Sequence, residues 1–84
     1  MIYEDYYNKL MKEMAAWSVD SLVEAFNCQV GNRGWVSIRC LYNKALKETF
    51  MEKGVDISAI YDGSTTSFAR KISLNENKTR VIFA

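Results

Sequence analysis

The stretch from Gly34 to Gly54, GWVSIRCLYNKALKETFMEKG, limits the possible folds of this chain more than any other segment. Its apolar residues recur at helical spacing, which predicts one helix of about five turns. One face of this helix holds Trp35, Ile38, Tyr42, Ala45, Leu46 and Thr49. Val36 and Cys40 lie nearly opposite, where a surface helix usually carries charge. Because a helix that is apolar on two sides is usually covered on two sides, we expect this one at the centre of the fold.

Two amphipathic helices are expected before this central helix. In residues 3–17, apolar residues at three- and four-residue steps form one stripe. The members of this stripe are Tyr3, Tyr7, Leu10, Met11, Met14 and Trp17. Residues 18–27 predict a second, shorter helix. Its N-cap is either Ser18 or Ser21, since Ser21 and Glu24 also have the spacing of a capping box.

The central helix is expected to end at Lys53-Gly54. Glycine suits the left-handed residue after a helix, and Val55 stands where a Schellman motif places its hydrophobic contact. Residues 55–66 predict one short turn capped by Asp56, followed by a loop that begins at Asp62-Gly63.

The end of the sequence predicts a β-hairpin. Residues 68–74 alternate between two faces, and residues 79–84 are rich in strand-forming residues, with Val81 and Phe83 on one face. The loop between these strands is expected at residues 75–78. Two strands alone are marginal in water, so their apolar face must pack on the helices. The predicted fold is therefore α+β, with three helices and a C-terminal hairpin packed on the central third helix, in an order compatible with a winged helix.

The composition fits a single small domain over residues 1–84. Nearly half of the residues are apolar (49%), so a core is possible, although a chain of this length buries a modest one. The net charge is +1, but it is unevenly distributed. Residues 1–27 hold two basic and five acidic residues, and residues 28–84 hold nine basic and five acidic residues. This asymmetry indicates an anionic partner on one face, with chance scatter as an equally weighted alternative.

Missing residue types disfavour several functions. The chain has no histidine, which removes the commonest general base and a frequent zinc ligand. It has no phosphate-binding glycine motif, and Glu48 and Glu52 lie on the polar side of a helix. We therefore expect no enzymatic activity, metal, cofactor or small-molecule substrate. Cys28 and Cys40 are expected to be buried free thiols, with one disulfide between them as the alternative.

The sequence also gives an expectation for the compartment. The first ten residues, MIYEDYYNKL, are acidic and polar, unlike the basic and apolar regions of a signal peptide. No apolar run approaches the roughly 18 residues that a membrane span needs. We therefore expect a soluble, cytoplasmic protein that does not bind a membrane.

The function favoured by the sequence is nucleic-acid binding or regulation. In a winged helix-turn-helix domain the third helix enters the major groove, and the hairpin contacts the backbone. The predicted footprint comprises Asn32, Arg33, Ser37, Arg39, Lys44, Lys47, Lys71, Lys78 and Arg80. The connection before the third helix is longer than in that motif, and Val36 and Cys40 are apolar on the expected reading helix. Ordinary solubilising surface charge is an equally weighted interpretation.

The alternative function is a protein–protein interaction module, with a homodimer expected. Eleven aromatic residues and four methionines exceed what one small core readily hides. The predicted interface on the first helix comprises Tyr3, Tyr6, Tyr7, Met11 and Trp17. The last strand offers a second route, because an uncovered edge can pair with another chain. Core packing of the same aromatic residues stays the competing interpretation.

Overall fold

A computed structural model describes residues 2–30, 37–64 and 66–84 of the chain. Its elements are the helices α1 (Ile2–Ala15), α2 (Val19–Gln29) and α3 (Ser37–Glu52), then the strands β1 (Ile72–Leu74) and β2 (Val81–Phe83). The strands form an antiparallel hairpin, so the predicted α+β order is confirmed. Asn32 and Arg33 in the connection before the third helix, and the expected start of that helix at Trp35 and Val36, lie outside the described residues.

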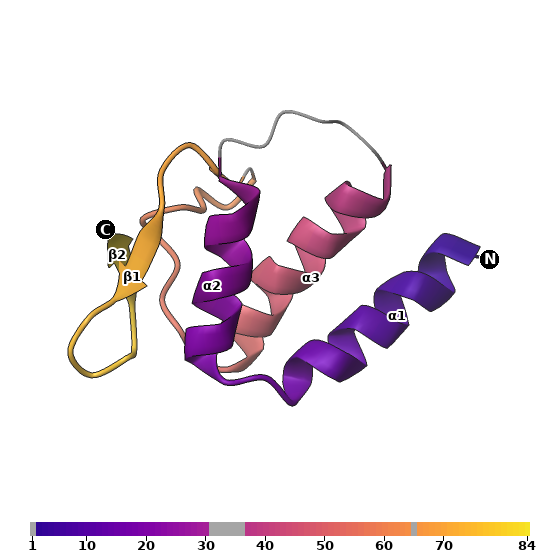
Figure 1. Ribbon diagram of the computed structural model, residues 1–84, viewed down its shortest axis with the longest axis horizontal. Helices are drawn as coiled ribbons and strands as arrows, with labels where there is room; N and C mark the ends of the chain where they lie inside the picture. Colours follow the sequence, from indigo (N-terminus) through magenta and orange to yellow (C-terminus); the bar gives the residue numbers. More distant parts are fainter. Residues whose placement is uncertain (1, 31–36, 65) are drawn as a thin grey trace.

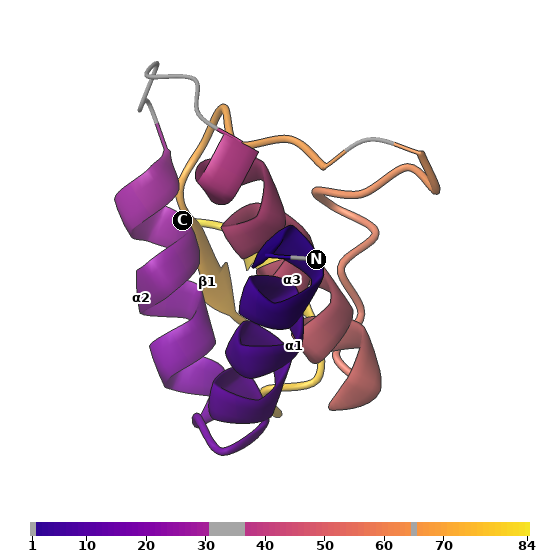
Figure 2. The same cartoon turned by 90° about the vertical axis from the view of Figure 1, so that its right-hand side faces the viewer.

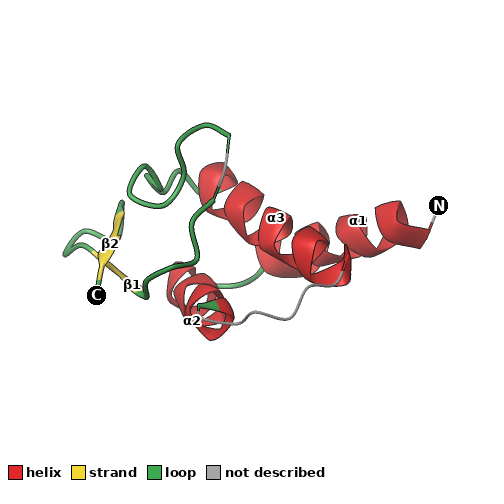
Figure 3. Cartoon of the chain, turned by 90° about the horizontal axis from the view of Figure 1, so that it is seen from above, coloured by secondary structure: helices red, strands yellow, loops and turns green. Residues whose placement is uncertain are grey.

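Helix α3 lies between the two other helices (Figures 1 and 2). Helix α1 packs along one side of α3, α2 packs on another side, and β1 rests on α2. The hairpin and the N-terminus are at opposite ends of the molecule, as the view in Figure 3 also shows. Within the ranges that the structure describes, no helix has the length and apolar character needed to cross a membrane.

One hydrophobic core joins all five elements. It contains Leu10, Met14, Leu22, Phe26, Ala45, Leu46 and Phe50 from the helices, Val55, Ile57 and Ile60 from the segment after α3, and Ile72 and Val81 from the hairpin. The predicted inner face of α3 is confirmed where it is described, because Ala45, Leu46 and Thr49 are at most 1% exposed. The Thr49 hydroxyl donates to the Ala45 carbonyl oxygen at 2.7 Å, so its burial leaves no unpaired polar group.

Capping interactions set the boundaries of α2 and α3. Ser18 is the N-cap of α2, and its Oγ accepts the Ser21 N–H at 3.1 Å, which decides between the two candidate serines. Helix α3 ends in the predicted Schellman motif. Gly54 has a φ of +76°, and Val55 donates its N–H to the Phe50 carbonyl oxygen at 3.0 Å. The buried Val55 side chain supplies the expected hydrophobic contact.

The expectation that both cysteines are buried is wrong. Cys28 and Cys40 are free and exposed. Cys40 lies on the side of α3 opposite the core, so the second flank of this helix is not closed over it.

The hairpin is shorter and more open than predicted. Its first strand begins at Ile72 and not at Phe68, because the Phe68 ring turns inward and stacks on Phe26 with 4.4 Å between ring centroids. Phe83 shares the inner face with Val81 but is 43% exposed. The Arg70 guanidinium, 4.4 Å from the ring centroid, covers Phe83 in place of the core.

Asn27 joins the last turn of α2 to the hairpin. Its Nδ2 donates to the Ile72 carbonyl oxygen at 2.9 Å, and its Oδ1 accepts the Ile72 N–H at 2.8 Å. In the register of the hairpin, these backbone groups of Ile72 point away from β2. The amide of Asn27 therefore replaces a neighbouring strand.

Asp56 pairs with the outer edge of the hairpin. Its N–H donates to the Thr79 carbonyl oxygen at 2.8 Å, and its carbonyl oxygen accepts the Val81 N–H at 2.9 Å. Its side-chain Oδ1 accepts the Ser58 N–H at 2.9 Å, which confirms the predicted cap of the short turn. The segment after α3 thus covers the start of the β2 edge.

Candidate functional site

The structure separates the predicted nucleic-acid-binding cations into two groups. Lys44 and Lys47 lie on α3, whereas Lys71, Lys78 and Arg80 belong to the hairpin, which packs on α2. Of the other predicted members, Asn32 and Arg33 lie outside the described residues, as do the side chains of Ser37 and Arg39. The five described cations of the predicted footprint therefore belong to two different parts of the fold, α3 and the hairpin.

The hairpin cations contact acidic side chains of the same chain. Lys78 Nζ lies 2.7 Å from Asp20 Oδ2, and Arg80 Nε lies 3.4 Å from Asp56 Oδ2. All four side chains are 46–61% exposed. Exposed ion pairs contribute little stability, but they reduce the net charge that this surface presents to a phosphate backbone.

The two lysines of α3 rest on aromatic rings. Lys44 Nζ lies 5.1 Å from the centroid of the Tyr7 ring, and Lys47 Nζ lies 4.8 Å from that of Tyr61. Lys47 is also 3.3 Å from Glu48 Oε1. Lys47 therefore contacts both a ring and a carboxylate. Lys44 contacts a ring, and no described carboxylate lies within ion-pair distance of it.

The predicted aromatic interface on α1 belongs largely to the protein's own core. Tyr6, Tyr7, Met11 and Trp17 are half-buried and pack against the core residues. Burial, with the nearby Glu48 carboxylate as a second cause, raises the pKa of Tyr7 above its ordinary value. The Tyr3 side chain lies outside the description. These contacts favour the core interpretation that the sequence left open.

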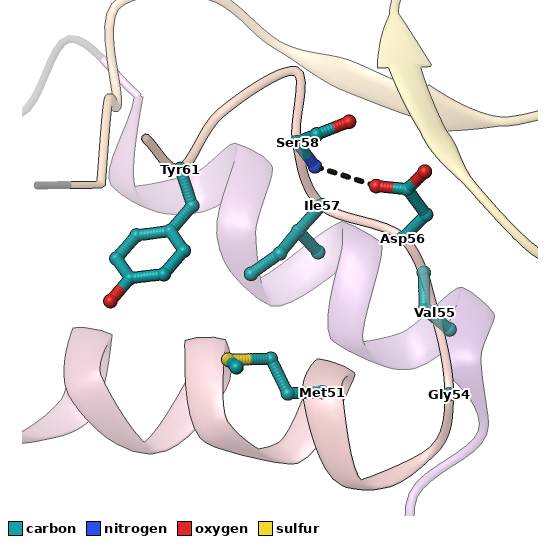
Figure 4. A pocket seen from close by; sticks show the side chains of 7 residues that line it. All are labelled: Met51, Gly54, Val55, Asp56, Ile57, Ser58 and Tyr61. Atoms are coloured by element: carbon teal, nitrogen blue, oxygen red, sulfur yellow. Dashed lines mark hydrogen bonds between the residues drawn. The ribbon is translucent and has the colours of Figure 1, made fainter. Parts of the chain in front are cut away.

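Two hollows that the sequence did not predict lie between α3 and residues 54–64 and 66–68, and we call this pair the groove. Its first part is a hollow of about 410 Å³ beside Met51, Val55, Ile57 and Tyr61 (Figure 4). Its second part is a hollow of about 470 Å³, lined by Cys40, Asn43, Lys44 and Lys47 of α3 and by Tyr61, Thr66 and Phe68 opposite. Tyr61 lines both hollows, and Lys47 Nζ of α3 lies 4.8 Å from the centroid of its ring.

The α3 wall of the groove is one helical stripe. Cys40, Lys44, Lys47 and Met51 are separated by four, three and four residues, which places them on one face, opposite the buried residues. Met51 is 49% exposed, so the end of the groove at Met51 is apolar and open. The other end is lined by Lys44 and Lys47, whose ammonium groups lie over the rings of Tyr7 and Tyr61. It also carries Asn43 Oδ1, which is buried without a hydrogen-bond partner among the described residues.

Sequence reasoning missed this groove for a definite reason. The stripe mixes a thiol, two lysines and a methionine, so it is neither an apolar face nor a run of charge. The spacing of four, three and four residues is the one signal in the sequence that places these four residues on one face of the helix. The opposite wall, residues 54–64 and 66–68, has no regular period, and the packing of Val55, Ile57 and Ile60 into the core helps to hold it beside α3.

Known proteins offer no guide to this site. Comparisons with protein-family models, with curated proteins and with solved structures gave no match to the chain. No group of three or more His, Cys, Asp or Glu side chains in residues 2–30, 37–64 and 66–84 is placed to hold a metal ion.

Proposed function

We propose that this chain is a small non-enzymatic protein-interaction module whose groove along α3 receives a segment of a partner protein. The observation that carries this proposal is the position of Met51. This large apolar side chain is half-exposed and stands beside a hollow together with Val55, Ile57 and Tyr61. Exposed apolar surface inside a concave site is typical of binding surfaces.

The other two candidate interfaces are less available. The described aromatic residues of α1 pack on the core, and Asp56 already pairs with the start of the β2 edge. The walls of the groove, in contrast, come from α3 and from residues anchored by Ile57 and Ile60, so its shape is largely formed before a partner arrives.

The two free thiols give a direct test with an internal control. Cys40 lines the groove, whereas Cys28 is exposed on α2 and lines neither hollow. Peptides selected from a displayed library of random 12-residue sequences are added to the protein, and the alkylation rate of each thiol by iodoacetamide is measured by mass spectrometry. We expect slower alkylation of Cys40 with an unchanged rate at Cys28. Equal rates with and without every selected peptide would refute the groove as a binding site.

The charge of the hairpin supports nucleic-acid binding as a second candidate function. Residues 69–84 contain Arg70, Lys71, Lys78 and Arg80 but one carboxylate, Glu76. The exposed ion pairs of Lys78 and Arg80 are weak enough for a phosphate to displace the carboxylates.

A salt titration tests this second candidate. Affinity for duplex DNA should fall steeply with salt, because each neutralised phosphate adds about −0.9 to the slope of log affinity against log salt. Lys71→Gln should make that slope less steep by about 0.9, the value for one lost phosphate contact. No binding at low salt would remove this candidate.

The homodimer expected with the interaction module is tested separately by a light-scattering mass at high protein concentration.

A further inference from the structure

We propose that α1 exchanges between two copies of this chain, so that each α1 docks on the α3 of the other copy in a domain-swapped homodimer. The interaction surface is the side of α3 that α1 covers, and the partner that fits it is the α1 of an identical chain. Exchange of an identical element is a low-cost route to a dimer, because the native contacts are kept. This inference does not depend on the groove and goes beyond the proposed function.

Helix α1 is an arm that lies along one other helix. Its main packing partner among the described elements is α3, and Figure 1 shows α1 and α2 diverging from the short link between them. The face that α1 buries is apolar, since Leu10 and Met14 are 8% and 0% exposed. An undocked α1 would open this face and the α3 surface beneath it to water. The α1 of a second copy matches that surface by construction.

Two polar contacts fix how α1 lies on α3. Thr49 Oγ1 lies 3.7 Å from Met11 Sδ, and Lys53 Nζ donates to the Ala15 carbonyl oxygen at 3.1 Å. From the first contact to the second, both helices advance by four residues, so they run in the same direction with one register. An exchanged α1 therefore has a single defined position on the α3 of the other copy.

The link between α1 and α2 holds no residue that enforces a turn. Residues 2–30 contain neither glycine nor proline, and none of them has a positive φ. The end of α3 is different, because Gly54 there has a φ of +76°. The bend between α1 and α2 depends on the Ser18 cap, which accepts the Ser21 N–H, and on the docking of α1. Short hinges of this kind favour domain swapping.

Straightening the link joins α1 and α2 into one helix over residues 2–29. Two separate helices leave N–H groups at the start of α2 and carbonyl groups at the end of α1 without helical partners. In the continuous helix, Val19 N–H donates to the Ala15 carbonyl oxygen, the group that Lys53 Nζ contacts in the bent form. Helical hydrogen bonds thus replace the capping bonds, and α1 is carried away from its own α3.

Val19→Pro separates the bent form from the straight one. Ser18 has a φ of −71° and a ψ of 160°, the extended conformation that a following proline favours, and Val19 is the first residue of α2, where proline is tolerated. The variant therefore fits the monomer. It breaks the continuous helix, because proline inside a helix removes a hydrogen bond and clashes with the carbonyl four residues earlier. Val19→Ala is the matched control, since it also shortens the side chain but keeps the N–H.

The dimer is measured by light scattering on a sizing column after refolding from urea at low and at high protein concentration. We expect a wild-type dimer at high concentration. Val19→Pro should raise its dissociation constant at least about 100-fold relative to Val19→Ala. Ser18→Ala removes the cap in both copies and should lower it about tenfold or more. In a dimer of labelled and unlabelled chains, the Met11 methyl group of one chain should show an NOE to the Thr49 methyl group of the other. Circular dichroism confirms that the variants are folded.

Three results would overturn this inference. They are a wild type that stays monomeric after refolding at high concentration, a dimer that Val19→Pro weakens no more than Val19→Ala does, and a dimer without the intermolecular NOE. None of them changes the protection of Cys40 by a bound peptide. Failure of this inference and failure of the proposed function are therefore told apart.

Discussion

Asn27→Ala should strongly destabilise the domain, because it removes both hydrogen-bond partners of a buried backbone. Ile72 is 1% exposed, and its N–H and C=O bond to the Asn27 amide at 2.8 and 2.9 Å. Each buried backbone group left unpaired costs about 1–3 kcal/mol. For two groups, with partial relaxation of the hairpin, we expect a loss of about 2–4 kcal/mol. That is a large share of the roughly 4–13 kcal/mol typical of a domain this size.

Urea unfolding followed by tryptophan fluorescence measures this loss. The matched control is Asn8→Ala, since Asn8 is an exposed helical asparagine on α1, and its substitution should change the free energy of unfolding by less than about 0.5 kcal/mol. If Asn27→Ala costs no more than Asn8→Ala, then Asn27 does not hold the hairpin in the way described.

Asn27→Asp adds a pH signature to the same test. A carboxylate at this position accepts the Ile72 N–H, but it places negative charge against the Ile72 carbonyl oxygen. The neutral acid restores a donor, so folding should raise the pKa of this carboxyl. The protonated group then stabilises the fold below the unfolded-state pKa, and this contribution is lost as pH rises through the folded-state pKa. The deficit relative to wild type should therefore shrink as pH falls from 7 to 4, and a constant deficit would contradict the mechanism.

Three further predictions concern other residues. Gly54→Ala should cost about 1–2 kcal/mol in urea unfolding, because φ is +76° and no atom lies within 4 Å of the added Cβ, so the cost is purely conformational. The Ser58 N–H is the main cause that lowers the pKa of Asp56 below 3.8, so the charged carboxylate stabilises the fold above that value and loses its effect as pH falls through the folded-state pKa. Asp56→Asn should accordingly flatten the acid limb of a plot of stability against pH below about pH 4, and an unchanged limb would contradict this. Lys78→Gln should change the free energy of unfolding by less than about 1 kcal/mol, because the Lys78–Asp20 pair is 60% exposed on both sides; a larger loss measured in urea would show that the pair is not merely superficial.

The features predicted well from the sequence depend on local chemistry. The start of α2 at one of two candidate serines, the Gly54 helix end and the buried Ala45–Thr49 face each follow from residues within about one turn of one another. The hairpin also follows from local alternation. For these features, tertiary packing agrees with the local preference and does not have to overrule it.

The features missed from the sequence depend on contacts between distant residues. The inward turn of Phe68 is set by Phe26, 42 positions earlier, and this contact shortens the first strand. The exposure of Cys40 depends on which side of α3 the segment 54–68 leaves open. The groove itself lies between a regular helix and an aperiodic segment, so the residues of its second wall carry no periodic signal.

The backbone bridge at Asp56 has a consequence for self-assembly. A hairpin that shows both apolar side chains and an open edge is a template for fibril growth, and here the chain's own residues after α3 occupy the first part of that edge. Any added strand is restricted to the part of β2 beyond Val81, which is too short to seed a stable ladder. Variants that detach residues 55–57 from β2 should therefore aggregate at temperatures where the helices are still intact.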